Sequence, residues 1–266
     1  MRKVWLKYFE VARTNVRSRW TYLWDQLLST AFLAVIMFVF VQLWRVTFAA
    51  TGSGNINGYT LPEMIWYLVA TESLVTSLPR IHHTLQAEVK DGDLAIRLNK
   101  PYNYLLFHYS AYVGEGLFQL GLKLFTGGLT AYLLVGGFAF RWAAVPVLIA
   151  IYITTQALHF CFSAAIGLAA FWTEDVSGLY FIFDRVKWIL GGFLLPIEVY
   201  PDAVRRIAEA LPFQYMIASP ARLFVKFDAG AALRLVGSQA VWLAVFGAVC
   251  WGLYRLGVRR VDVNGG

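Results

Sequence analysis

The residues of this chain that could carry out chemistry are few, and the most suggestive of them lie close together. Asp91 and Asp93 flank Gly92, and two carboxylates in such a turn can hold a magnesium ion and a pyrophosphate group. The other candidates are four histidines: His82, His83, His108 and His159. No pair of histidines has the H-x-x-x-H spacing of a metal site. A polar turn between two helices therefore explains the isolated acidic pair better than a metal site does.

The sequence also lacks the loops that bind nucleotides. It contains no G-x-x-x-x-G-K-[ST] loop and no G-x-G-x-x-G segment opening a helix. So few polar candidates remain that no Ser/His/Asp arrangement can be argued. We therefore expect the chain to hold neither a metal nor a cofactor of its own, and an enzymatic role has weak support.

The composition explains why polar chemistry is scarce. Of the 266 residues, 59% are hydrophobic and only 15% are charged, whereas soluble domains average about 45–50% and about 25%. These values exclude a soluble enzyme, a disordered chain and a disulfide scaffold. The two cysteines, Cys161 and Cys250, have no paired or metal-like spacing. The chain is predicted to be an integral membrane protein.

Long runs with few charges predict six membrane-spanning helices. A helical crossing of the bilayer needs about 20 mostly apolar residues, and runs of this length are not the alternating segments of a barrel. The predicted spans are 26–44, 59–78, 116–140, 142–173, 176–195 and 235–254. The fold class is therefore all-α, with one transmembrane domain over residues 1–266. Most of the 23 Lys and Arg residues then fall on the side of the N-terminus, which predicts that both termini are cytoplasmic.

Some charges fall inside the predicted spans, where ionisable groups are costly and usually paired or functional. Glu72 and Lys123 each lie roughly 12–14 Å from the inner surface at about 1.5 Å per residue. We expect them to pair between the second and third spans; the alternative is that each side chain reaches its own membrane surface. A second pair, Arg45 with Glu63, is expected near the outer surface.

Three segments outside the spans have patterns of their own. Residues 1–24 are basic and predict an interfacial helix, although a basic anchor that only sets topology fits equally well. Residues 80–114 predict a compact cytoplasmic element with a glycine turn, or else a solvated loop. Residues 196–230 are broken by prolines and predict two short re-entrant helices on the outer side, or else an ordinary surface loop.

At these segments the chain resembles the permease subunits of bacterial type-two ATP-binding-cassette (ABC) exporters, along nearly its whole length. One matching element is the pattern formed by Glu88, Gly92, Asp93, Leu94, Leu98, Lys100 and Pro101. The other is the region G-G-F-L-L-P-I-E-V-Y-P…L-P-F…P-A-R between Gly191 and Arg222. Lys123 and the cluster of Asp184, Arg185 and Lys187 depart from the family pattern.

The resemblance implies half of an exporter in the bacterial cytoplasmic (inner) membrane. Two permease chains, identical or homologous, would form the pathway for a hydrophobic or amphipathic substrate. Two separate ATPase subunits would bind ATP and magnesium, so this chain would not be an enzyme. The loop after the second span would couple to the ATPase, and by position the contact residues are Glu88, Asp91, Gly92, Asp93, Arg97, Lys100 and Pro101.

The resemblance also implies roles for two further sets of residues. Residues of the outer segment would cap the exit as a gate: Pro196, Glu198, Pro201 and Pro212. Aromatic residues of the second and fifth spans are candidates for lining the pathway, although they fit a lipid-facing or packing role equally well: Trp66, Tyr67, Phe181, Phe183 and Phe193. Two alternatives stay open, namely a membrane enzyme acting on lipid-linked substrates and an ATP-independent channel or scramblase.

Overall fold

The structure is a computed structural model that describes the backbone of residues 2–21, 23–173 and 175–264. Side chains are described over 6–18, 30–173 and 175–260. Within these residues the regular structure is helical, apart from one isolated bridge between Ile56 and Tyr59. The prediction of an all-α protein is confirmed.

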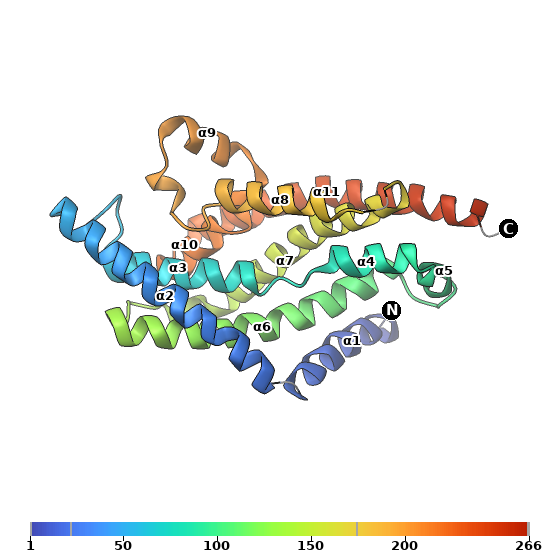
Figure 1. The fold of residues 1–266 in the computed structure, drawn as a ribbon, viewed down its shortest axis with the longest axis horizontal. Helices are drawn as coiled ribbons and strands as arrows, with labels where there is room; N and C mark the ends of the chain where they lie inside the picture. Colours follow the sequence, from blue (N-terminus) through green and yellow to red (C-terminus); the bar gives the residue numbers. More distant parts are fainter. Residues whose placement is uncertain (1, 22, 174, 265–266) are drawn as a thin grey trace.

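Among the described residues, four helices are long and apolar enough to cross a membrane. They are the segments Thr30–Thr51 of α2 (Leu23–Thr51), Tyr104–Val135 (α6), Trp142–Phe171 around α7 (Val145–Leu168), and Ala229–Arg260 of α11 (Ala229–Asn264). All four run roughly along the long axis of the molecule (Figure 1). They correspond to the predicted first, third, fourth and sixth spans, so a multi-pass membrane protein is confirmed.

The predicted second and fifth spans are shorter helices. Helix α3 (Leu61–Thr76) has 16 residues and α8 (Ser177–Leu190) has 14, which correspond to about 24 and 21 Å. A hydrocarbon core is about 30 Å thick. Pro79 lies in the break after α3, since proline cannot continue the helical hydrogen bonding, and α8 ends at Gly191. The count of six spans stays a prediction.

The chain reverses direction at each long helix, so its elements gather at two ends. The starts of α1 (Arg2–Thr21) and α6, helix α5 (Asp93–Leu98) and the end of α11 lie toward one end of the molecule (Figure 1). The loop after α2 and the connection between α6 and α7 lie at the opposite end. This arrangement is the one that alternating spans produce.

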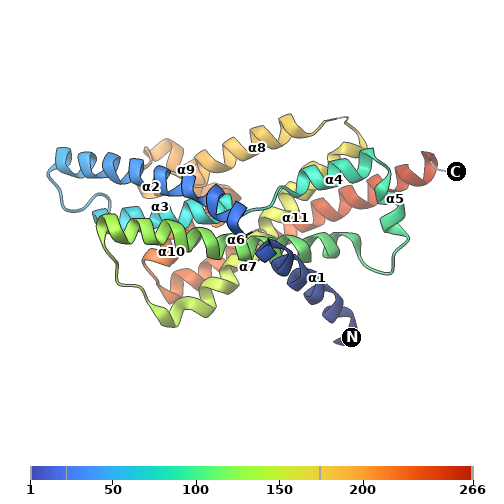
Figure 2. The same ribbon diagram turned by 60° about the horizontal axis from the view of Figure 1, so that its bottom comes forward.

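Helix α1 packs against α6 and projects obliquely from the rest of the bundle (Figure 2). Glycine at position 114 of α6 makes the close approach possible. A Cβ atom built there would lie 2.4 Å from the carbonyl oxygen of Ala12, far inside van der Waals contact. Residues 2–21 of the segment predicted over 1–24 therefore form a helix that packs against the membrane domain, and its interfacial position stays a prediction.

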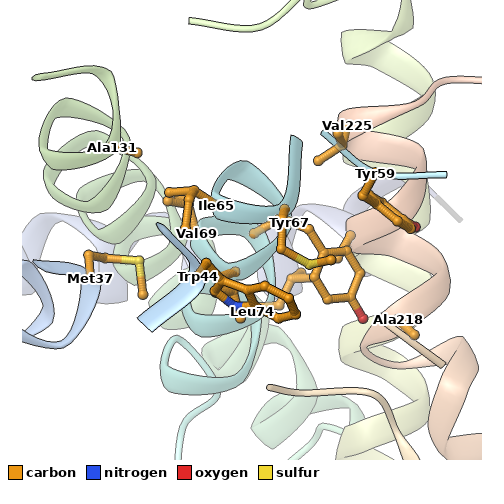
Figure 3. Packing of buried hydrophobic residues seen from close by; sticks show 14 of the residues in the cluster. Met37, Trp44, Tyr59, Ile65, Tyr67, Val69, Leu74, Ala131, Ala218 and Val225 are labelled. Carbon is orange, nitrogen blue, oxygen red and sulfur yellow. The ribbon is translucent and has the colours of Figure 1, made fainter. Parts of the chain in front are cut away.

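The largest buried core lies where α2, α3, α6 and α10 (Ala218–Val225) meet (Figure 3). Met37, Ile65 and Tyr67 are completely buried in it. The hydroxyl of Tyr67 donates a hydrogen bond of 2.5 Å to the carbonyl oxygen of Gly192, which ties α3 to the turn after α8. Helix α3 is thus the centre of the bundle, although it is too short to be recognised as a span by itself.

The two segments predicted between spans are folded into short helices. Residues 80–114 contain α4 (Ile81–Lys90), α5 and the first turns of α6, so the predicted loop ends earlier than expected, at Asn103. Residues 196–230 contain η3 (Ile197–Val199), α9 (Asp202–Ala210), η4 (Pro212–Tyr215), α10 and the start of α11. Helix α9 stands off the bundle, away from α5 (Figure 1). Whether these helices re-enter the membrane stays a prediction.

Candidate functional site

A buried carboxylate holds the short helix α5 in place. Glu88 on α4 is only 6% exposed. Its Oε1 atom lies 2.8 Å from Nε of Arg97 on α5. Its Oε2 atom accepts a hydrogen bond of 2.7 Å from the hydroxyl of Tyr104 and lies 3.0 Å from Nε2 of His108, both on α6. One side chain therefore joins α4, α5 and α6.

The electrostatics of Glu88 favour its charged form. Burial by itself would raise the pKa of this carboxyl. The hydrogen bonds from His108 and Tyr104 and the charge of Arg97 outweigh burial, and they lower the pKa below its ordinary value. The carboxylate is consequently ionised at neutral pH and forms charge-assisted hydrogen bonds, which are the stronger kind.

The turn between α4 and α5 needs glycine. Gly92 has a φ of +77°, a left-handed conformation that residues with a Cβ rarely adopt. Next to it, Asp93 begins α5, where a negative charge complements the helix dipole. The acidic pair around Gly92 is thus part of a turn between two helices, as expected.

Most of the predicted coupling residues are exposed on this turn and the segment that follows α5. The exposed ones are Asp91, Gly92, Asp93, Lys100 and Pro101. Arg97 is only partly exposed, because it contacts Glu88 and lies over the ring of Phe107 at 5.7 Å. Sequence reasoning missed Ile96, whose side chain is 63% exposed. Exposed apolar residues flanked by charges are typical of a protein contact.

Glu88 does not fit the contact role predicted for it. Its carboxylate is buried and already engaged on three sides. We therefore assign Glu88 to positioning α5, and keep the contact role as a prediction for the exposed residues. Only the packing of α4 shows that Glu88 faces inward, because the sequence alone does not give the orientation of its side chain.

The predicted pair of Glu72 and Lys123 does not meet at ion-pair distance among the described residues. The ammonium group of Lys123 donates a hydrogen bond to the carbonyl oxygen of Thr76, one helical turn after Glu72. The charge of Lys123 still acts on the buried carboxyl of Glu72. The two groups are neighbours on α6 and α3, so a role for them as a pair remains a prediction.

The expected pair of Arg45 and Glu63 is wrong. Glu63 lies 3.1 Å from the ammonium group of Lys226, which follows α10. Arg45 instead donates a hydrogen bond of 2.5 Å to the carbonyl oxygen of Leu134 on α6. The error arises because α10 returns to the start of α3, a long-range contact that span order does not reveal.

The predicted gate residues lie at the same end of the molecule as Lys226. Pro196 and Pro212 are buried, whereas Pro201 is exposed. Glu198 forms an ion pair of 2.7 Å with Arg222 on α10, and its carbonyl oxygen accepts a hydrogen bond of 3.1 Å from Asn57. The segment is tied to the loop after α2, and its role as a gate stays a prediction.

The five aromatic residues predicted to line a pathway lie in different surroundings. Tyr67 and Phe193 are buried in the bundle. Trp66 donates a hydrogen bond of 3.0 Å from its indole nitrogen to the carbonyl oxygen of Gly136. Phe183 is half-buried, and Phe181 is 60% exposed. Phe181 and Phe193 border two different cavities, and the role of all five residues as a lining stays a prediction.

The cavity that Phe181 borders has a volume of about 520 Å³ and lies between the end of α3, the start of α4 and α8. Its wall combines charged and aromatic side chains: Arg80, Lys123, Asp184, Lys187, Phe181 and Trp188. Two of these residues, Asp184 and Lys187, belong to the cluster that departs from the family pattern. Sequence reasoning marked those residues as unusual but did not bring them together with Lys123.

A buried polar chain leads from the cavity into the bundle. The ammonium group of Lys187, which is 1% exposed, lies 2.7 Å from Oδ1 of Asp184 and 3.1 Å from Nε2 of His159 on α7. Nδ1 of His159 lies 2.7 Å from the hydroxyl of Tyr112 on α6. In the sequence, the i, i+3 spacing of Asp184 and Lys187 could have indicated the ion pair between these two residues.

The comparison with known families decides the class of protein. A family described as ABC-2 family transporter protein matches residues 32–265, which is most of the chain. The chain belongs to the ABC-2 transporter family. It is a permease subunit of this family, and no curated protein matches it.

Membership and structure together define the permease as a multi-pass transmembrane component of an ABC transporter. Permeases of this family generally work with ABC ATPase partners in the membrane. Within the described residues, no group of three or more His, Cys, Asp or Glu side chains is arranged to hold a metal ion. The match to the family supports the transport role directly. The exposed surface around α5 is the candidate site for contact with a partner.

Proposed function

We propose that this permease forms half of the pathway of an ATP-driven exporter for hydrophobic or amphipathic molecules. A second permease chain, identical or homologous, would supply the other half. The proposal places six spans and both termini as in the sequence-based topology, in the cytoplasmic membrane of a bacterium. Membership of the ABC-2 family and the apolar helices support this assignment.

The permease would receive its energy through α5. Two ATPase subunits, which bind ATP and magnesium, would dock against the exposed residues of the turn and of α5. The observation that carries this step is the Glu88 cluster, which fixes a short, surface-exposed helix on α4 and α6. A rigidly held helix can pass a displacement of the ATPase to the membrane helices as a rigid-body movement.

The test is purification of the permease with its ATPase, followed by measurement of ATP hydrolysis and transport. The variant Asp93→Lys reverses a charge at the start of α5, and Ile96→Asp removes the exposed apolar contact. Both should abolish transport and weaken the complex with the ATPase. The matched control is Asp202→Lys, which reverses an exposed acid in the first turn of α9, at a distance from α5.

The control should leave the complex and transport unchanged. If Asp93→Lys and Ile96→Asp also leave both unchanged, α5 is not the coupling element. If no ATPase associates with the permease, the exporter assignment itself fails, and the channel or the membrane enzyme becomes the better assignment. A separate experiment tests the outer segment 196–230 as a gate, by cross-linking it to the loop after α2.

A further inference from the structure

The cavity between α3, α4 and α8 carries more positive than negative charge. Three cations border it, namely Arg80, Lys123 and Lys187, against one carboxylate, Asp184. That carboxylate is engaged with Lys187 at 2.7 Å. Within the described side chains neither Arg80 nor Lys123 has a carboxylate within ion-pair distance, although both border the same space.

The nearby acidic residue does not cancel this charge inside the cavity. Glu72 acts electrostatically on Lys123, but it does not border the cavity and it is 4% exposed. The charges of Arg80 and Lys187 also act on His82 at the start of α4. Burial and the charges of His83, Arg80 and Lys187 lower the pKa of His82 to about 3, so this ring stays neutral and adds no charge.

The remaining wall suits an apolar group. Phe181 and Trp188 of α8 border the cavity together with Val75 of α3 and Leu78, which follows α3. Arg80 lies in the break between α3 and α4, at the inner membrane surface in the proposed topology. Cationic and apolar groups therefore face the same space at the depth where the heads of amphipathic molecules lie in a membrane.

We propose that this cavity binds the anionic head of an amphipathic molecule, with its phosphate or carboxylate group between Arg80 and Lys123. The apolar part of the molecule lies against Phe181 and Trp188. The assignment of this occupant as the cargo rests on the proposed function; the binding itself does not. Lys187 stays fixed by Asp184 and His159 and adds a positive charge to the inner wall of the cavity.

The test uses quenching of tryptophan fluorescence, because Trp188 borders the cavity. The full-length permease in phosphatidylcholine nanodiscs is titrated with a bromine-labelled alkyl phosphate and with the uncharged alcohol of the same chain. The phosphate should quench at concentrations at least about tenfold lower than the alcohol, since only the phosphate forms charge-assisted hydrogen bonds with Arg80 and Lys123. Trp188→Phe should remove this part of the quenching.

Substitutions locate the charge that recognises the phosphate. Arg80→Gln and Lys123→Gln should each weaken binding of the phosphate by about tenfold and leave the alcohol unchanged. Arg80→Lys keeps the charge and should retain most of the affinity. The matched control is Arg234→Gln, which removes a largely exposed arginine on α11 and should change nothing. Arg80 is exposed, so its substitution should not prevent folding.

Two results would overturn the proposal: equal binding of the phosphate and the alcohol, or unchanged affinity in both glutamine variants. The source of the anion is distinguished by adding an anionic phospholipid to the nanodisc. Competition identifies the lipid head group as an occupant, whereas no competition identifies a molecule from outside the bilayer. The measurement needs no ATPase, so a failure to find that partner would leave its result intact.

Discussion

The substitution Glu88→Gln tests whether one carboxylate holds α5. Glutamine has nearly the same size, so the packing of α4 is kept. Its carbonyl oxygen can take the place of Oε2 and accept both hydrogen bonds, from Tyr104 and from His108, because an amide oxygen has two lone pairs. Its amide group then faces Arg97 and does not attract it, so the variant loses the ion pair at 2.8 Å, and the two hydrogen bonds lose their charged acceptor.

The expected loss can be worked from these contacts. Arg97 is about one-third exposed in its side chain, so solvent screens the ion pair and its contribution is about 1 kcal/mol. The two hydrogen bonds lie in a buried setting, and with a neutral acceptor they become weaker by about 1–2 kcal/mol together. Together they lower the stability of the docked α5 by about 2–3 kcal/mol, which corresponds to about 30- to 150-fold more frequent opening.

Hydrogen exchange of the purified permease measures this opening directly. Backbone amides of residues 93–98 should exchange faster in Glu88→Gln by the factor given above, whereas those of α2 and α7 should not change. The control Asp91→Asn removes an exposed acid of the same turn and should leave exchange unaltered. If exchange in α5 is the same in Glu88→Gln as in the wild type, the carboxylate does not hold the helix.

Three further predictions concern stability. The folded-state pKa of Glu88 lies below its ordinary value of 4.5. The backbone amides of α5 should therefore be fully protected from hydrogen exchange above pH 4.5 and should lose this protection as the pH falls through the lowered pKa. Exchange rates corrected for the intrinsic effect of pH would show this. Gly114→Val should destabilise the docked α1 by about 1–3 kcal/mol in thermal unfolding, whereas Gly121→Ala, which has open space around it, should have little effect. Lys187→Met should lower the stability of the folded permease by about 3 kcal/mol, because it leaves the carboxylate of Asp184 without its cation. The double variant with Asp184→Asn should recover more than half of the lost thermal stability. If it recovers none, the two residues are not coupled.

The sequence predicts those parts of the fold that depend on hydropathy alone. Runs with few or no charges locate the four long helices, because an apolar stretch of span length has few other solutions. Helices α3 and α8 are less distinct since each carries charges that only tertiary contacts make acceptable. Lys187 is an example, because its charge is matched by Asp184 one turn earlier, and its ammonium group also lies 3.1 Å from Nε2 of His159 on another helix.

The contacts between distant segments could not be predicted in the same way. Glu63 and Arg45 both belong to the same end of the molecule, as expected from span order, but span order does not say which neighbours they meet. The return of α10 to α3 gives Glu63 its partner Lys226 instead. Likewise, the family pattern marks Glu88 as part of the coupling element, yet only the helix packing shows that it faces inward.

Helix α4 connects the two regions for which we propose a function. Its first residues, His82 and His83, border the cavity, and Glu88 lies less than two turns further along the same helix. A helix of ten residues is about 15 Å long and behaves as a stiff rod over that distance. If a ligand displaces the start of α4 and the helix moves as a rigid body, we expect Glu88 to move with it, together with the ion pair to Arg97 on α5. The Glu88 cluster and the cavity thus lie at the two ends of one helix, which is the arrangement that coupling between them would need.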